Sequence, residues 1–265
     1  MSTIISASLV KELRDQTGAG MMDCKRALEE AGGDIEAART LLRERGVAQA
    51  AKRSGRETTE GKVVFDITSE SVAAMVAVGC ETEPVSKNEE FMVFAYRALE
   101  AVKEHGRDAA EALEADRVEL VARLGENIVV TGAARFEGAE HEILTAYVHP
   151  PRNMLGVLLH AKGSSDLAYK LAMHIAAAAP LYVSRDDVPA AEVAAERDIL
   201  SKQEDVLEKP EQVREKIVQG RIEKWFEGCV LADQVWIHDT DRRVGEVLVE
   251  VGLEVVEFAR FALAE

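Results

Sequence analysis

The stretch that decides the fold runs from Leu13 to Leu28 and reads LRDQTGAGMMDCKRAL. Gly18 and Gly20 interrupt its helical pattern, because glycine is a poor helix former and is common just beyond a helix C-terminus. We expect one helix before the break, capped by Ser6 or Ser8, and a second helix after it. Apolar residues recur at helical spacing on both sides: Leu9, Val10 and Leu13, then Met21, Cys24, Ala27, Leu28 and Ala31.

A third helix is expected after the glycine pair that ends the second. Asp34 is placed to cap it, and the helix should end at Gly46. Its apolar positions are Ile35, Ala38, Leu41 and Leu42. Residues 1–54 therefore predict a small three-helix domain, with a polar, flexible linker over Gln49–Gly61.

Beyond residue 55 the pattern predicts two related α+β subdomains that form a core, over residues 55–140 and 141–185. Each contains two strands followed by a helix. The predicted segments are Lys62–Ile67, Ala73–Cys80 and Asn88–Glu104, then Glu142–His149, Met154–His160 and Asp166–Ala179. A helix near Arg117–Leu124 and a strand near Ile128–Val130 complete the first subdomain. The fold class is α+β with helix in excess.

Residues 186–228 predict a protruding helical hairpin. Charged residues are dense there, apolar residues are sparse, and Pro210 divides the segment into two arms. Residues 229–265 should complete the second subdomain and add a C-terminal module. That part predicts a strand at Val235–His238, a helix at Arg243–Val251 and an edge strand at Val255–Leu263.

Charge argues against direct binding to nucleic acid, since the formal net charge is −16. Residues 1–56 carry ten Lys/Arg and eight Asp/Glu, a balance of +2 against −18 for the remainder. The start, MSTIISASLVKEL, lacks a basic leader with a long apolar run, so neither export nor a membrane span is expected. Three cysteines without a CxxC motif indicate free thiols in the cytoplasm.

Motifs of catalysis are missing from the sequence, which contains no GxSxG, HExxH, GxGxxG or phosphate-binding GK[ST]. A helix-breaking turn is favoured over a phosphate site at Gly18–Gly20. His174 lies on an apolar helix face, where a hydrogen-bonded or interface histidine is favoured over a metal ligand. Glu81 and Glu83 could do acid–base work, but a solvated loop is favoured. We expect no catalytic residue, no cofactor and no metal, and hence no enzyme.

The stretch Leu13–Leu28 closely resembles the N-terminal signature of the bacterial elongation factor Ts family. Thr82–Val85, reading TEPV, stands where that family has a second signature, Thr-Asp-Phe-Val. The resemblance covers essentially the whole chain. Further similar segments are Gly125–Ile128, Met173–Ala177, Glu223–Phe226 and Val244–Gly245.

The resemblance implies a ubiquitin-associated-like N-domain, a two-subdomain core, a helical hairpin and a C-terminal module. It also implies a partner, the GTPase elongation factor Tu in its GDP form. Members of the family disturb the magnesium and phosphate contacts of that partner, GDP leaves, and GTP replaces it. Whether the hairpin makes homodimers stays open.

The resemblance also implies which residues meet the partner. His174 and its helix would serve a distant contact, and Thr82, Glu83, Pro84 and Val85 would be pushed toward the magnesium site. The N-domain surface would be Lys11, Arg14, Met21, Met22 and Lys25. Methionines often belong to a core and cations to a solvated face. Adjacent methionines cannot both point inward on a small helix, however, which favours an interface.

The second signature departs from the family at Ala77, Gly79, Glu83 and Pro84, where the family has an acidic residue, asparagine, aspartate and phenylalanine, respectively. The last of these replaces a phenylalanine that acts as a wedge. Because proline fixes φ, we expect the segment to be held in one extended shape and to act through rigidity and charge.

Two other functions remain open from sequence. One is a non-enzymatic adaptor whose helical N-domain binds a ribosomal or ubiquitin-like partner, with the core as a passive scaffold. The other is an enzyme, which a deep pocket lined by perturbed titratable groups would indicate.

Overall fold

A computed structural model describes residues 5–69, 71–163 and 166–264 of the chain. Within these ranges the fold is α+β, with eleven α-helices and two three-stranded sheets, which confirms the predicted class. The first four residues of the expected segment 1–54 and the last of 229–265 lie outside them. No helix in the described ranges is both long and apolar enough to cross a bilayer.

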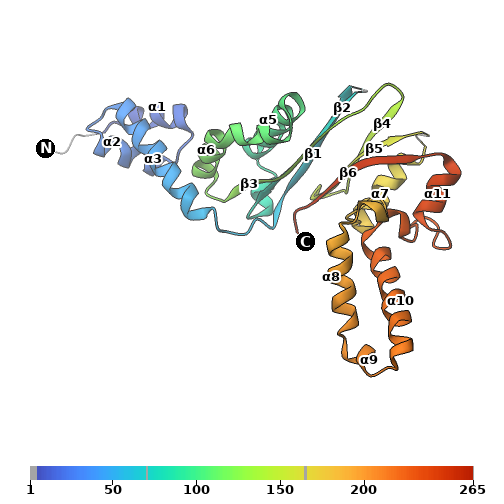
Figure 1. Cartoon of the computed structure of the whole chain (residues 1–265). Coiled ribbons are helices and arrows are strands. Elements are labelled where there is room, and N and C mark those ends of the chain that lie inside the picture. Colours follow the sequence, from blue (N-terminus) through green and yellow to red (C-terminus); the bar gives the residue numbers. More distant parts are fainter. Residues whose placement is uncertain (1–4, 70, 164–165, 265) are drawn as a thin grey trace.

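Three helices form one end of the molecule (Figure 1): α1 (Ala7–Thr17), α2 (Met21–Glu30) and α3 (Ile35–Arg53). The predicted caps are confirmed, because Ser6 accepts from the Leu9 N–H and Asp34 accepts from Glu36 and Ala37. Gly18 ends α1 in the left-handed conformation, at φ 66°. The helices bury Val10, Leu13, Cys24, Ala27, Leu28 and Ala38 between them.

The third helix is longer than predicted. It does not end at Gly46 but continues to Arg53, because Gly46 lets α3 pack closely on α6 (Glu114–Leu124). A Cβ at Gly46 would lie 3.1 Å from the Ala122 Cβ. Ala50 is buried in the neighbouring core cluster. The linker predicted over Gln49–Gly61 was therefore wrong for its first half, and only residues 54–59 separate α3 from the first strand.

Two antiparallel sheets make the centre of the molecule. One has the order β1 (Glu60–Ser69), β2 (Val72–Cys80), β3 (Ile128–Glu137), and the other β4 (Glu142–Val148), β5 (Leu155–Lys162), β6 (Glu254–Ala262). The sheets pack face to face through apolar side chains. Helices α5 (Glu89–His105) and α6 cover the outer face of the first sheet, and α7 (Ala168–Ala178) and α11 (Val244–Val251) pack on the second.

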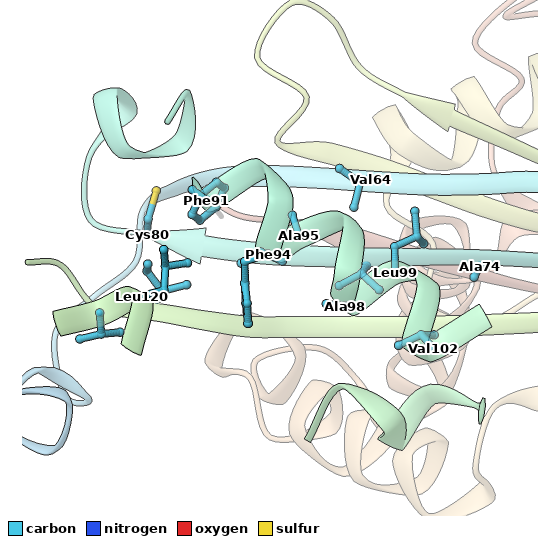
Figure 2. Close-up of a cluster of buried hydrophobic side chains, with 14 of the residues drawn as sticks. Val64, Ala74, Cys80, Phe91, Phe94, Ala95, Ala98, Leu99, Val102 and Leu120 are labelled. Atoms are coloured by element: carbon cyan, nitrogen blue, oxygen red, sulfur yellow. The ribbon is translucent and has the colours of Figure 1, made fainter. Parts of the chain in front are cut away.

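Strand β2 is buried on both faces. Ala74, Val76, Val78 and Cys80 pack toward α5 and α6, and Figure 2 shows α5 running along the strands between Cys80 and Ala74. The alternate residues Ala73, Met75 and Ala77 pack toward the second sheet. With β1 on one side and β3 on the other, β2 is also paired along both edges.

Two helical arms, joined by a short helix, project from the body (Figure 1). These elements are α8 (Ala190–Ser201), α9 (Glu204–Leu207) and α10 (Glu211–Cys229), and Pro210 precedes the second arm as expected. A cluster including Leu200, Val218 and Ile222 packs the arms together. The short elements are α4 (Glu83–Ser86), η1 (Arg107–Leu113), η2 (Arg185–Asp187) and η3 (Leu231–Asp233).

The C-terminal part differs from prediction in one segment. Val235–His238 is not a strand but a loop, with a single bridge from Val235 to Arg243. Trp236 is buried there, and its ring lies 5.2 Å from that of His174 and 4.8 Å from that of His238. The apolar residues that suggested a strand therefore anchor a loop. The predicted final edge strand is confirmed as β6.

Candidate functional site

The Thr82–Val85 segment forms a helical turn directly after β2. Thr82 is extended, with φ −132° and ψ 152°, and α4 begins at Glu83. The expected extended loop was therefore wrong. Proline suits the first turn of a helix, because its φ is already helical and its missing N–H would be unpaired there. Glu83 is exposed and pairs with Lys87 at 2.7 Å.

Glu126 caps this turn from the connection between α6 and β3. Its carboxylate accepts from the backbone N–H of Glu81 at 3.1 Å and of Thr82 at 3.0 Å, and from the Thr82 hydroxyl at 2.5 Å. Glu81 reaches the opposite way and accepts from the Asn127 N–H at 2.7 Å. We call these four residues, Glu81, Thr82, Glu126 and Asn127, the carboxylate clasp.

Arg56 supplies positive charge to the clasp. Its guanidinium lies 3.2 Å from the Glu81 carboxylate, and its carbonyl accepts from the Asn127 side chain at 2.8 Å. Burial raises the pKa of Glu81, but the Asn127 hydrogen bond and Arg56 outweigh burial and lower that pKa overall. Glu81 is thus a structural carboxylate and not the solvated loop residue that was favoured.

The N-domain residues implied by the resemblance are all exposed. Met21 and Met22 at the start of α2 are 58% and 65% exposed. Lys11 and Arg14 are exposed one helical turn apart on α1, and Lys25 pairs loosely with Glu29 at 3.7 Å. The core interpretation of the two methionines is wrong. We call Lys11, Arg14, Met21, Met22 and Lys25 the cation–methionine face.

His174 on α7 has no exposed surface. Its Nδ1 accepts from the Ile237 N–H at 3.3 Å, so its Nε2–H donates to the Gln234 Oε1 at 3.0 Å. Burial lowers the pKa of His174 and keeps the ring neutral. The structure thus supports the hydrogen-bonded interpretation. Direct contact with a partner is incompatible with this burial, and His174 can act on a surface only through the loop it holds, where Val235 and Ile237 are partly exposed.

Two titratable groups in the surface hollow between α5, η1 and β3 are paired with each other. Glu114 and Arg117 line it and form an ion pair, which lowers the pKa of Glu114 and raises that of Arg117. Arg117 also donates to the Ile128 carbonyl at 2.8 Å. Among the described residues, no group of three or more His, Cys, Asp or Glu side chains could hold a metal ion.

The predicted residues thus fall into three separate places: α1 and α2, the turn after β2, and the interior beside α7. Sequence reasoning missed Glu126 as a site residue. Its only signal was the Gly125–Ile128 resemblance, which does not reveal what the carboxylate binds.

Comparison with known proteins decides the family. The sequence profile described as Elongation factor TS matches residues 81–265. Elongation factor Ts of Halorhodospira halophila is 40% identical over 98% of this chain and 92% of its own length. That of Shewanella amazonensis is 41% identical over 98% and 91%. The chain belongs to the elongation factor Ts family.

Membership of the elongation factor Ts family confirms the resemblance drawn from the signatures. The profile begins at Glu81, a member of the carboxylate clasp, and the full-length relatives extend the similarity through the N-terminal helices. Thioalkalivibrio sulfidiphilus has an elongation factor Ts that is likewise 40% identical over 98% of this chain. The chain is therefore an elongation factor of protein synthesis.

Proposed function

We propose that the chain binds elongation factor Tu in its GDP form, in the cytoplasm, and promotes exchange of GDP for GTP by disturbing the magnesium and phosphate site. Such a factor needs no chemistry of its own. It needs a contact surface that keeps its own conformation while the partner's magnesium and phosphate site changes conformation. The observation that supports this best is the exposed Thr82–Val85 turn, constrained by Pro84 and held by the carboxylate clasp at the end of a doubly buried strand.

The cation–methionine face would supply affinity. Exposed methionines adapt to a partner surface, and cations add electrostatic attraction. The loop held by His174 would add the distant contact through Val235 and Ile237, which are 48% and 42% exposed. The turn would then act on the nucleotide site while the other contacts hold the complex.

The finer architecture is part of the same proposal. The N-terminal helices would be a ubiquitin-associated-like domain. The units β1–β2–α5 and β4–β5–α7 would be related subdomains, because each is a hairpin whose following helix packs on the outer face of its sheet. A homodimer through the hairpin would use its exposed Ile199, Leu207 and Val213, and light scattering of the full chain would test it.

Release of fluorescent GDP from elongation factor Tu tests the function. Mixing the preloaded GTPase with excess unlabelled nucleotide should give slow release alone and much faster release with this chain. A matched variant, Arg97→Ala, should accelerate release equally, because Arg97 pairs with Asp116 and belongs to none of the three places. Binding without acceleration would contradict the proposal and favour the adaptor.

A further inference from the structure

One short segment at the end of α6, residues 121–127, contacts both surfaces that the proposed function uses. Arg123 lies against the Gly18 turn of the N-terminal helices, and Ala122 lies against α3. Glu126, only three residues after Arg123, caps the Thr82 turn. We call residues 121–127 the bridge segment.

The Arg123 side chain fills the space beside Gly18. A Cβ on Gly18 would lie 2.5 Å from the Arg123 Cδ, and Gly18 has a positive φ of 66°. The Arg123 guanidinium is fixed by Glu90 on α5, with Nε 2.6 Å from its carboxylate. Gly18 stands three residues before Met21, so this contact lies in the turn that joins the two helices carrying the cation–methionine face.

Helix α3 adds a second line of contact with the same segment. Gly46 allows the 3.1 Å approach to Ala122, and the Arg53 guanidinium donates to the Val121 carbonyl at 3.4 Å. Ala50, between them in α3, is 3% exposed. A flexible tether would leave these groups in water, whereas here they are packed against the core.

The other end of the bridge segment leads directly into the clasp. Gly125 ends α6 in the left-handed conformation, at φ 78°, and its N–H bonds the Val121 carbonyl at 3.0 Å. Glu126 and Asn127 follow at once and take part in the clasp. A single turn of backbone therefore separates the groups that hold the two surfaces.

We propose that the bridge segment fixes the spacing between the cation–methionine face and the Thr82 turn, so that the partner meets them as one preformed surface. What binds there rests on the proposed function, whereas the fixed spacing does not. Once one of the two surfaces has bound, the other meets the partner at a higher effective concentration, because no flexible linker has to be ordered. Arg123 and Glu126 are positioning residues in this arrangement.

The spacing is tested without any partner. Spin labels on Lys25→Cys and Lys87→Cys, both exposed positions, report the distance from α2 to the end of α4. The native thiols are buried, and burial raises their pKa values, to about 12 for Cys80, so they label slowly.

Pulsed electron resonance should give one narrow distance distribution in the full chain and in the control Arg97→Ala. It should broaden in the double variant Gly46→Val, Arg123→Ala, which removes both lines of contact. A broad distribution in the parent, or no broadening in the double variant, would overturn the proposal. Circular dichroism checks that the variants are folded. If Gly46→Val does not fold, Gly46→Ala takes its place, because it adds only the Cβ that would lie 3.1 Å from the Ala122 Cβ.

Exchange kinetics test the two ends of the bridge segment separately. Gly46→Val, Arg123→Ala should raise the half-saturating concentration about tenfold and keep the maximal rate, because only effective concentration is lost. Glu126→Gln should lower the maximal rate and change half-saturation little, because it frees the turn. If the double variant and Glu126→Gln changed the half-saturating concentration and the maximal rate in the same way, Arg123 and Glu126 would not have separate positioning roles. If the parent accelerates nothing, the proposed function fails while the spacing result stands.

Discussion

At the residue scale, the clasp surrounds two carboxylates with hydrogen-bond donors. Four hydrogen bonds from three N–H groups and one hydroxyl converge on Glu81 and Glu126, and Arg56 adds a positive charge. Hydrogen bonds to ionised acceptors are the strong ones. Of the two carboxylates, Glu81 also has a lowered pKa, so its hydrogen bond to the Asn127 N–H is made by an ionised acceptor.

Acid should weaken this arrangement. Because the folded-state pKa of Glu81 lies below its ordinary value of 4.5, its contribution is present above that value and is lost as pH falls through the folded-state pKa. Glu81→Gln should therefore be less stable than the parent at pH 7, and the difference should shrink below about pH 4.5.

Urea unfolding at a series of pH values measures this difference. Glu83→Gln is the control, because Glu83 is exposed and its surface pair with Lys87 contributes little. A parent–variant difference independent of pH would show that Glu81 acts through shape alone.

Gly79 stands where the family resemblance expects asparagine, and the structure gives the reason. A Cβ there would lie 2.6 Å from the Thr58 Oγ1, in the segment that joins α3 to β1. Gly79→Asn should destabilise the chain by about 1–3 kcal/mol, the usual cost of overpacking. Thermal unfolding measures the loss. Adding Thr58→Gly, which removes both the Oγ1 and the Cβ that would lie 2.9 Å away, should recover much of it, and no recovery would place the strain elsewhere.

Glu83 and Pro84 together define the turn and its charge. Replacing both by glycine should slow GDP release at saturating concentration well beyond any loss of binding, because the helical turn loses its proline and its Lys87 pair. Pro84→Phe should be tolerated or faster. Stopped-flow release of labelled GDP separates rate from affinity. Unchanged release in the double-glycine variant would assign the exchange step to other contacts.

At the element scale, the hairpin should be separable from the core. Its apolar cluster is its own, apart from contacts at the base near Tyr182 and Val230. Replacing residues 194–221 by a short glycine turn should keep the core folded and change its melting temperature by only a few degrees. Calorimetry tests this. A large loss of stability would show that the hairpin supports the core.

Most elements could be predicted from the sequence, because their apolar spacing and caps are local signals. Ser6 and Asp34 cap their helices as expected. The failures share a physical cause in tertiary contact. Glycine has a low helix propensity, so Gly46 was expected to end the third helix. The close approach of Ala122 shows that Gly46 instead allows two helices to pack together. Val235–His238 has the composition of a strand, but it forms a loop that the buried Trp236 anchors to the core.

The candidate site was predictable only in part, for the same reason. The exposed methionines follow from helical geometry. Glu126 could not be found, because its partners Glu81 and Thr82 are remote in sequence and meet it only when β2 pairs with β3. His174 could be placed on an apolar face, but its complete burial depends on the loop that folds over it.

At the scale of the whole molecule, the proposed exchange would be a linkage between two ligands of one partner. If this chain weakens GDP binding by some factor, GDP must weaken binding of this chain by the same factor. Calorimetry can measure both factors. Titrating this chain into nucleotide-free and GDP-bound elongation factor Tu gives the weakening caused by GDP, titrating GDP with and without this chain gives the weakening caused by the chain, and the two should be equal. Unequal factors would indicate a further bound species, and equal affinity for both forms would rule out exchange by linkage.

The rigidity of strand β2 bears on the proposed exchange. When the Thr82 turn presses on a partner, both proteins experience the same force, and the less rigid of the two deforms more. The Thr82 turn is mounted on a strand whose residues from Ala73 to Val78 are at most 1% exposed and paired along both edges. Its amide groups should therefore be among the slowest to exchange with solvent. In the proposed complex, the partner would then be the part that deforms, and the displacement would occur around its nucleotide.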